Sequence, residues 1–476
     1  MSSEILSIGI DIGTSTTQVV FSRLVMENTS SYFTVPNINI IDKRVVYKSD
    51  IYTTPLETQK LVDGEAVKKI ISTEYEKAGF SPKDTSTGAV IITGESARKE
   101  NAALVLEKLS EFAGDFVVST AGPDLESIIA GKGSGAQQHS EENDCVAVNL
   151  DVGGGTTNIA VFDCGEAIAK GCYDIGGRQL CLSDDGVVSY ISTSVNKIIE
   201  YFNIDLRTGK KADLNELKKL SDKMTNLLEQ ALNISEKTPL LDEVKTANSG
   251  DLIITKPIRA VFFSGGVADC IYKTGFEPFE FGDIGVMLGE SIRGSLITSS
   301  FQLITPRETI RATVVGAGTY TTTISGSTIT YTSDIFPLKN VPVLKLNTTE
   351  EQRCLDGDSE FLKGQVKWFL EQSDATQFVL ALKGRSNPSY NDLRLFARCI
   401  TQALDDLLLP NEPILVLLER DIAKALGQAI KQALGDKRNV VSIDGIKVEQ
   451  SNYLDFGKPM MDGLVIPVVV KTLVFG

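Results

Sequence analysis

The sequence predicts an α/β protein in which two related domains flank a cleft and an additional α/β module follows. Two observations predict this fold: a hairpin pattern that occurs twice at a domain-sized spacing, and apolar strands that alternate with helical stretches. The chain has 476 residues, which corresponds to about three domains at roughly 150 residues each. We therefore expect a first domain at 1–140, a second at 141–300, and a module at 301–476 that is first β-rich and then α/β.

The repeated pattern is an apolar strand with an aspartate near its end, a glycine- and hydroxyl-rich turn, and a second strand. Leu6–Ile12 contains Asp11, and Cys145–Val152 contains Asp151. Each copy predicts two antiparallel strands joined by a tight turn. The two aspartates lie 140 positions apart (151 − 11), a spacing that indicates an internal duplication rather than a solenoid.

Strands and helices alternate between and after the two hairpins, which is typical of parallel βα sheets. Before the second hairpin, we expect helices at Lys60–Ala78, Ser96–Phe112 and Pro123–Ala130, with strands at Gly88–Ile92 and Phe116–Ser119. After it, we expect helices at Ser189–Phe202 and Asp213–Leu232, followed by a strand at Ala260–Phe263.

From about residue 300 the chain is rich in Thr, Ile and Tyr, and then returns to the α/β pattern. Arg311–Val314 and Thr319–Tyr331 predict β-hairpins because β-branched and aromatic residues favour strands. Further on, we expect strands at Phe378–Leu382, Ile414–Leu418, Val440–Ile443 and Leu464–Val474, and helices at Leu393–Leu408 and Asp421–Leu434. Pro467 places the last strand near an edge of its sheet.

The composition argues against several classes of function. The net charge is −15, so a nucleic-acid partner is not expected. The only histidine, His139, is expected in a solvated loop, which argues against a Ser-His-Asp triad and a histidine-ligated metal. Seven cysteines without a CxxC pair predict no disulfide framework, and Cys164, Cys172 and Cys181 are a weak candidate for a metal site. We recognise no secretory signal or membrane span and expect a cytoplasmic protein.

The turns that follow Asp11 and Asp151 suit a phosphate ligand. Backbone N–H groups of a glycine-rich turn approach phosphate oxygens closely because no Cβ intervenes, and hydroxyl groups donate further hydrogen bonds. A carboxylate at each strand end can hold the waters of a magnesium ion, so we expect Asp11 and Asp151 to bind hydrated Mg²⁺ and to act in catalysis. The expected phosphate-binding residues are Gly13, Thr14, Ser15, Thr16, Gly153, Gly154, Gly155, Thr156 and Thr157.

A third element is the strand end Ser264, Gly265, Gly266 and Val267, where two glycines before a helix let a flat adenine ring lie close to the backbone. In this order, the three elements resemble the two phosphate motifs and the adenosine motif of the actin/hexokinase/heat-shock-70 ATPase superfamily. The resemblance implies duplicated actin-like (ribonuclease H-like) ATPase domains around a nucleotide cleft, with ATP or ADP and Mg²⁺ as ligands. It also implies connecting helices at Gly122–Gly135 and Gly282–Gly289.

Members of that superfamily often carry an acidic residue in the first connecting helix that orients water or metal. The resemblance therefore implies a further catalytic carboxylate in the first connector. Asp124 and Glu126 both qualify, and Glu126 is taken as the candidate.

Over its full length the chain is similar to the large ATPase-type factors that reactivate ethanolamine ammonia-lyase. The similarity is carried by Gly265–Tyr272, Thr309–Gly318 and Asp462–Leu473. It implies a chaperone-like ATPase of ethanolamine degradation that uses Mg-ATP to release damaged cobalamin from the adenosylcobalamin-dependent lyase. The partner would be the lyase itself, in the cytoplasm or in a bacterial microcompartment. The oligomeric state stays open, with a homodimer as one expectation.

Three rival functions stay open at this point. A small-molecule kinase of the same superfamily needs a catalytic aspartate beside a substrate hydroxyl, and Asp174 could serve, although a turn aspartate is the simpler interpretation. The others are a filament-forming or structural actin relative, and an assembly adaptor that binds ATP without turnover.

Overall fold

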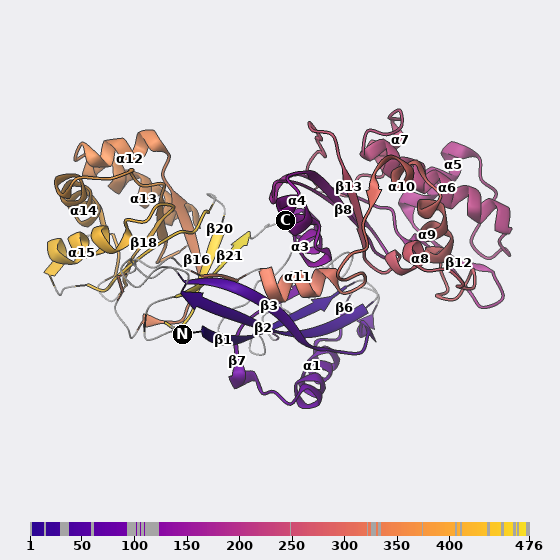
Figure 1. Cartoon of the computed structure of the whole chain (residues 1–476), viewed down its shortest axis with the longest axis horizontal. Helices are drawn as coiled ribbons and strands as arrows, with labels where there is room; N and C mark the ends of the chain where they lie inside the picture. The colour runs from indigo at the N-terminus through magenta and orange to yellow at the C-terminus, as the bar shows by residue number, and fades with distance from the viewer. Residues whose placement is uncertain are drawn as a thin grey trace.

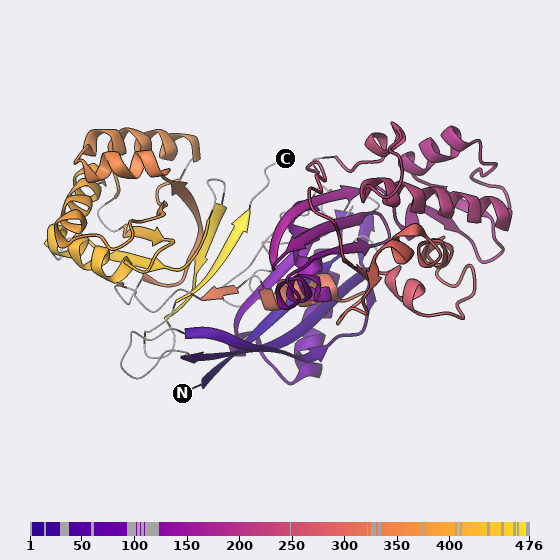
Figure 2. The same cartoon turned by 45° about the horizontal axis from the view of Figure 1, so that its top comes forward.

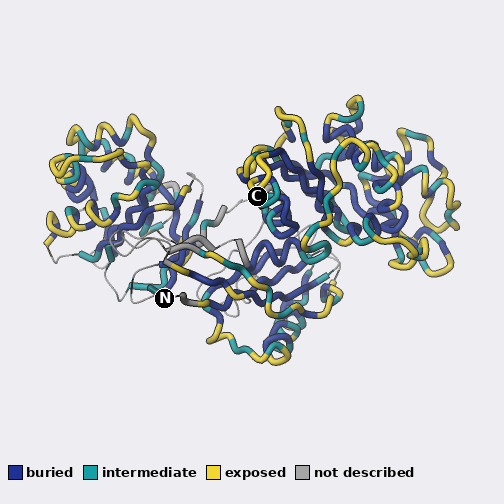
Figure 3. Tube along the Cα trace, in the orientation of Figure 1, coloured by how far each residue is buried: buried dark blue, intermediate teal, exposed yellow. Residues whose placement is uncertain are grey.

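Three main β-sheets organise the chain in the computed structural model, each covered by helices (Figures 1 and 2). Buried residues gather in the sheets and in the helices that cover them, as Figure 3 shows for the described residues. The structure describes residues 2–13, 16–28, 38–58, 61–92, 101, 105, 109, 123–247, 249–320, 322–324, 330–331, 335–373, 375–404, 407–409, 412–435, 438–448, 452–459, 463 and 466–472.

The first sheet forms because its opening strand, β1, has a different chemistry on each face. Side chains alternate along a strand, so Ile8, Ile10 and Ile12 all point to one face, where they are fully buried against helix α1 (Gly64–Ala78). The strand order is β3 (Ile38–Lys48), β2 (Thr16–Asn28), β1 (Ser2–Ile12), β7 (Thr85–Ile92), and β4 (Tyr52–Thr53) also pairs with β2. β5 (Leu56–Thr58) and β6 (Leu61–Val62) form a small separate hairpin.

The second sheet repeats the first. Its strand order is β10 (Glu166–Tyr173), β9 (Thr157–Asp163), β8 (Val146–Val152), β13 (Ala260–Ser264), β14 (Gln302–Leu303). In both sheets the first three strands are antiparallel, and the next strand pairs in parallel with the first one in the chain. The predicted duplication is therefore confirmed at the level of topology.

Helices cover the outer face of the second sheet. They enclose one large apolar cluster that includes Val148, Leu150 and Val152 of β8. The helices are α5 (Thr193–Phe202), α6 (Leu214–Ala231), α7 (Leu240–Glu243), α8 (Ala268–Tyr272), α9 (Gly285–Arg293) and α10 (Leu296–Ser300), and β11 (Leu180–Leu182) pairs with β12 (Val188–Ile191) beside them.

Two crossing helices lie between the first two sheets. α3 (Pro123–Ser134) packs on the second sheet, and α11 (Ala312–Tyr320) packs on the first sheet and on α3. The backbones touch at glycines: a Cβ on Gly133 would lie 1.8 Å from the Ala312 carbonyl oxygen, and one on Gly316 would lie 2.1 Å from that of Ile129. The layers are therefore sheet, α11, α3, sheet, and this arrangement with the duplicated strand order is the actin-like fold that the motifs predict.

The position of the second connecting helix is a correction. The expected stretch, Gly282–Gly289, instead begins α9, which packs on α6 and α8 within the second domain. The connector is α11, and the strand expected at Arg311–Val314 is wrong. Gly316 and Gly318 of this helix let it pack closely on Ile129 and on Gly9, and this packing outweighs the strand preference of Thr313 and Val314.

Other expectations have mixed outcomes. His139 lies on α4 (Ala136–Glu142) rather than in a loop, with its ring 5.4 Å from that of Phe262. Most of the helix expected at Ser96–Phe112 and all of the strand expected at Phe116–Ser119 lie outside the described residues. Of the stretch Thr319–Tyr331, the first two residues end α11 and Thr322–Ile324 forms a strand as expected, whereas residues 321 and 325–329 lie outside the described residues. All seven cysteines are free, and the described residues hold no cluster of His, Cys, Asp and Glu that could bind a metal.

The third sheet has its helices on one face. Its strand order is β15 (Thr322–Ile324), β21 (Pro467–Thr472), β20 (Asn452–Phe456), β16 (Leu338–Lys345), β17 (Val379–Leu382), β18 (Ile414–Leu418), β19 (Val440–Asp444). β16 to β19 are parallel, as their buried apolar sequences predict. The covering helices are α12 (Thr348–Leu355), α13 (Ser359–Ser373), α14 (Tyr390–Leu404) and α15 (Ala423–Leu434).

The division into 1–140, 141–300 and 301–476 stays a proposal. α11 does not fit this division, because the helix lies after residue 300 in the chain but packs on the first sheet.

Candidate functional site

Both hairpin turns line a single cleft of about 540 Å³ between the first two sheets. The start of α3, the end of β13 and the first residues of α11 complete its wall. The predicted site residues that line it are Asp11, Gly13, Thr16, Glu126, Asp151, Gly153, Gly154, Gly155, Thr156, Gly265, Gly266 and Val267.

The two turns are built alike. In the first, the Gly13 amide donates to the Thr16 carbonyl oxygen at 2.8 Å, and in the second the Gly153 amide donates to that of Thr156 at 2.9 Å. The strands on either side pair in the same register, Ile12 with Thr17 and Val152 with Thr157. The two turns therefore share their closing hydrogen bond and their strand register, one on each side of the cleft.

Five other predicted residues are not among the described residues that line the cleft. The Thr157 hydroxyl is fully buried and donates to the Ile175 carbonyl oxygen at 2.7 Å, so it supports the turn instead of facing the cleft. Ser264 is also fully buried and donates to Asp151. Thr14 and Ser15 lie outside the described residues. Asp124 belongs to α3, but the structure describes only its backbone.

The second turn is held by the segment after β10. The amides of Gly177 and Arg178 donate to the carbonyl oxygens of Gly153 at 3.0 Å and Gly154 at 2.7 Å, and the Gln179 side chain donates to that of Gly155. These bonds engage the turn's carbonyl oxygens. Within the described residues, the amides of Gly154 and Gly155 have no backbone acceptor, which leaves them for an anion.

Asp151 is a buried acid of the cleft with a raised pKa. Its carboxylate accepts from the Ser264 hydroxyl at 2.5 Å and from the Thr313 hydroxyl at 3.5 Å. Burial raises the pKa of Asp151 to about 6, and the two hydroxyl bonds oppose that rise. A carboxylate that is costly to ionise in isolation favours a nearby cation.

Asp11 and Glu126 are nearly as buried, each with 8% of its surface exposed. Since the described residues hold no close group of three or more His, Cys, Asp and Glu, these carboxylates do not form an all-protein metal cage. They suit a magnesium ion, which keeps several of its waters and needs few protein ligands.

Sequence reasoning missed a second symmetric pair, Gln18 and Asn158. Each pairs directly with the aspartate of its hairpin, Asp11 with Gln18 and Asp151 with Asn158, and each lines the cleft with 2% exposure. Their side-chain oxygens have no hydrogen-bond partner within the described residues. The signal was available, because these residues obey the same spacing of 140 as the aspartates.

Beside the predicted Val267, the cleft has an apolar end with two aromatic rings that the sequence did not indicate. Val267, Cys270, Phe276 and Phe281 line this end, with the two phenylalanine ring centroids 5.9 Å apart. A Cβ on Gly265, which has φ +87°, would lie 2.4 Å from the Val152 carbonyl oxygen, so only glycine fits there. This end offers flat apolar surface beside an exposed backbone, which suits an aromatic base.

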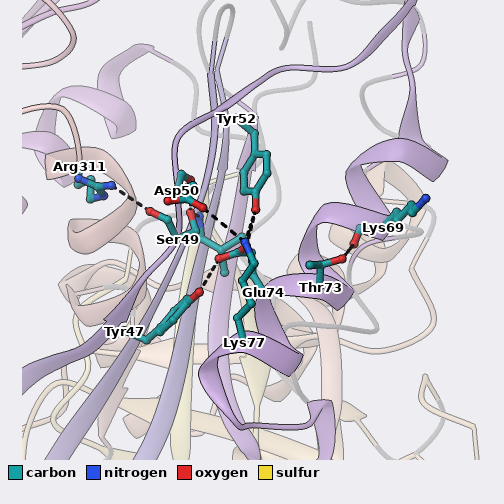
Figure 4. Close-up of polar contacts among 10 residues, drawn as sticks. Tyr47, Ser49, Asp50, Tyr52, Lys69, Thr73, Glu74, Lys77 and Arg311 are labelled. Carbon is teal, nitrogen blue, oxygen red and sulfur yellow. Dashed lines mark hydrogen bonds and ion pairs between the residues drawn. The ribbon is translucent and has the colours of Figure 1, made fainter.

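The first domain's wall of the cleft includes Ile51, which lies between β3 and β4. Figure 4 shows how the polar residues on either side of Ile51 are held. The Arg311 guanidinium donates to the Ser49 carbonyl oxygen at 2.9 Å. The fully buried Glu74 carboxylate accepts from the hydroxyls of Tyr47, before Ile51, and Tyr52, after it, and from the Lys77 ammonium.

Asp174, the candidate of the kinase alternative, is occupied elsewhere. Its carboxylate accepts from the Ser194 hydroxyl at 3.0 Å and from the Thr246 hydroxyl at 2.6 Å, and it does not line the cleft. The structure thus gives Asp174 a supporting contact and removes the residue on which the kinase alternative depended.

Sequence comparison finds relatives across the full length. The family model described as "Ethanolamine utilisation protein EutA" matches residues 3–476. The chain is 36% identical over 477 residues to "Ethanolamine ammonia-lyase reactivase EutA" of Salmonella typhimurium, covering 99% of each chain. It is 35% identical over 484 residues to the protein of the same name from Escherichia coli, again covering 99% of each.

Solved structures are more distant. An Aquifex aeolicus Ppx/GppA phosphatase aligns with a TM-score of 0.39 and 13% identity, covering 66% of this chain and 99% of that one. The ethanolamine utilization protein EutJ from Carboxydothermus hydrogenoformans aligns with a TM-score of 0.32 and 16% identity, covering 66% and 89%. Likeness at this level does not establish a fold, so the fold assignment rests on the strand order. Among the described residues, no helix has both the length and the apolar character to cross a bilayer.

Proposed function

The chain belongs to the EutA family of ethanolamine utilisation proteins, and from this we propose that it is an ATP-driven reactivase of ethanolamine ammonia-lyase. The role in reactivation is supported by the names of the two relatives. The use of Mg-ATP is supported by one observation above all: two turns closed by the same glycine-to-threonine backbone hydrogen bond, each beside a buried aspartate, line the same cleft.

We place the triphosphate between the two turns. Gly13 and Thr16, which line the cleft, would contact it from the first domain, and Thr156 with the amides of Gly154 and Gly155 from the second. The adenine would lie on Gly265 and Gly266, against the apolar end at Phe276 and Phe281. Thr157 is left out of this contact set because its hydroxyl already donates to Ile175.

Asp11 and Asp151 would hold the waters of Mg²⁺, which neutralises the charge of the phosphates. The buried side-chain oxygens of Gln18 and Asn158 support a hydrated Mg²⁺ at this position, because they can accept hydrogen bonds from its waters. Glu126 lines the cleft and would orient the attacking water. We expect slow turnover, because the product of this reaction is a change of shape.

The proposed cycle uses hinge closure. With ATP bound, both turns contact one ligand and the domains close across the α3–α11 crossing; after hydrolysis the contacts to the γ-phosphate are lost and the domains reopen. Driving such an equilibrium from mostly open to mostly closed needs about 5.5 kcal/mol of differential binding. Several charge-assisted hydrogen bonds of about 1.5–3 kcal/mol each are sufficient. The closed state would open the lyase and release the damaged cobalamin.

The test starts from lyase blocked with cyanocobalamin. Adding the chain, ATP, magnesium and fresh adenosylcobalamin is expected to restore ethanolamine deamination, and omitting ATP is expected to prevent it. Asp11→Ala and Asp151→Ala should each abolish recovery, whereas Asp184→Ala, which removes an exposed turn carboxylate, should have no effect. Lyase that stays inactive with the wild-type chain would sink the proposal.

A further inference from the structure

A second cavity, of about 580 Å³, lies in the helical layer of the third sheet, between α14 and α15. All of the residues that line it come from these two helices. They include Tyr390, Arg394, Leu395 and Arg398 on α14, and Ala429 and Gln432 on α15. None of them lines the nucleotide cleft, so the groove is a separate site.

The groove follows one stripe of α14. The lining positions of this helix run from 391 to 402 at spacings of three and four, which places them on one face. At 1.5 Å per residue the stripe is about 16 Å long, or about three helical turns. Arg394 and Arg398 lie one turn apart, so their guanidinium groups can bind two acidic groups that are also one turn apart.

The charge of the groove contrasts with that of the chain. The whole protein carries −15, yet no acidic residue lines the groove. Within the part of the chain that the structure describes, no carboxylate forms an ion pair with Arg394 or Arg398. Two guanidinium groups in one groove, without an acidic partner among the described residues, select an acidic occupant.

The groove also offers apolar anchors. Tyr390 is 65% exposed and Leu395 is 40% exposed, although both are large side chains that helices usually bury. On the opposite wall, α15 presents Ala429 and Ala433, whose small side chains leave room for an inserted side chain. Tyrosine and arginine are the residue types that contribute most to binding at protein interfaces.

We propose that this groove docks an acidic amphipathic helix of the lyase, with carboxylates one turn apart on Arg394 and Arg398 and an apolar side chain between Leu395 and Ala429. The inference rests on the proposed function, because that function supplies the partner. Figure 1 shows α14 and α15 at the end of the molecule away from α11 and the first two sheets. Docking there would leave the nucleotide cleft free to open and close while the partner stays bound.

The test measures the affinity of the full chain for purified lyase by calorimetry, with magnesium and either ADP or a non-hydrolysable ATP analogue. The double variant R394E/R398E is expected to bind about tenfold more weakly or worse, because two attractive contacts become repulsive. The matched control K69E/K83E makes the same change of charge on exposed lysines of the first domain and should bind within about twofold of wild type. The conservative variant R394K/R398K should lie between the two, since lysine keeps the charge but not the bidentate contact.

The outcomes separate the two proposals. If R394E/R398E binds the lyase as tightly as wild type, the docking site is wrong and the proposed function stands. If the wild-type chain binds no lyase in either nucleotide state, the proposed function fails, and so does the proposal that a lyase helix occupies the groove. Basal ATP hydrolysis should be unchanged in R394E/R398E. If that variant misfolds, the test uses Y390A/L395A, which truncates two exposed side chains. Wild-type affinity in Y390A/L395A would equally overturn the docking site.

Discussion

At the scale of single residues, neighbouring threonines in the second turn have opposite roles. Thr156 lines the cleft, whereas the Thr157 hydroxyl is buried and donates to the Ile175 carbonyl oxygen. The sequence suggested the same phosphate contact for both, because both are hydroxyl residues after a glycine run. Only the register of the hairpin decides that the second points inward.

We therefore expect Thr156→Val and Thr157→Val to separate binding from stability. Thr157→Val should lower the free energy of unfolding by about 1 kcal/mol, the usual value of a buried hydrogen bond, with little change in nucleotide affinity. Thr156→Val should weaken ATP binding about fivefold to tenfold, with a smaller effect on stability. Calorimetric titration with ATP and thermal melts of both variants check this, and equal effects of the two on binding would contradict it.

The same scale shows what the sequence could predict. Asp11, Asp151 and their glycines were found because they repeat in the sequence, and they meet at the cleft. Phe276 and Phe281 were missed because they belong to an irregular segment whose position only the packing of α8 and α9 determines. Gln18 and Asn158 were missed although a signal was present. Their spacing of 140 was visible in the sequence, but no pattern gave a reason to assign a role to a polar residue within a strand.

At the scale of elements, the segment beside Ile51 depends on the Glu74 cluster. Burial alone would raise the pKa of Glu74, but hydrogen bonds from Lys77, Tyr52 and Tyr47 lower it below its ordinary value of 4.5. A carboxyl group whose pKa is lowered by folding stabilises the protein above its unfolded-state pKa. That stabilisation is lost as the pH falls through the lower folded-state value.

We expect Glu74→Gln to lower the free energy of unfolding by about 2 kcal/mol at pH 7, because the hydrogen bonds to Glu74 lose their charged acceptor. The ion pair with Lys77 adds little to this value, since Lys77 is partly exposed and solvent screens the pair. The difference between wild type and variant should shrink as the pH is lowered below 4.5. Urea unfolding at a series of pH values measures it. A difference that is independent of pH would show that packing, not charge, makes the contribution.

The crossing of α3 and α11 is the other decisive element. Adding a methyl group at Gly133 would place a Cβ 1.8 Å from the Ala312 carbonyl oxygen, so the helices must move apart. Gly133→Ala is expected to destabilise the protein by about 1–3 kcal/mol and to lower the proposed ATP hydrolysis, since the proposed hinge lies there. Gly364→Ala, in an exposed turn of α13 with no atom near the new Cβ, is the matched control and should stabilise by about 0.5–1 kcal/mol. Thermal melts and ATPase rates of both variants test this, and unaltered behaviour of Gly133→Ala would contradict the close crossing.

At the scale of the whole molecule, the duplication made the two sheets predictable from the sequence, whereas the helix that connects back to the first sheet was not predictable. Both hairpins and the parallel strands of the third sheet follow from apolar patterns. The connecting helix α11 was misread because Thr313, Val314 and Val315 favour strands locally, while contacts with distant glycines decide for a helix. A local pattern cannot show such contacts.

Closure of the domains should be visible in solution. With magnesium and a non-hydrolysable ATP analogue, small-angle X-ray scattering is expected to give a smaller radius of gyration than with ADP, because both turns contact one ligand only when the γ-phosphate is present. Asp151→Ala should show no difference between the two nucleotides. An identical radius for the wild-type chain in both states would contradict hinge closure.

The return of α11 to the first sheet also constrains how the chain is made. The Ser7 hydroxyl donates to the Gly318 carbonyl oxygen across 311 positions, so the amino-terminal sheet lacks part of its cover until that helix has been synthesised. At roughly 5–20 residues per second, the nascent amino terminus must wait about 15–60 s on the ribosome with one apolar face incomplete. During this interval, the growing polypeptide would be a natural client for general chaperones.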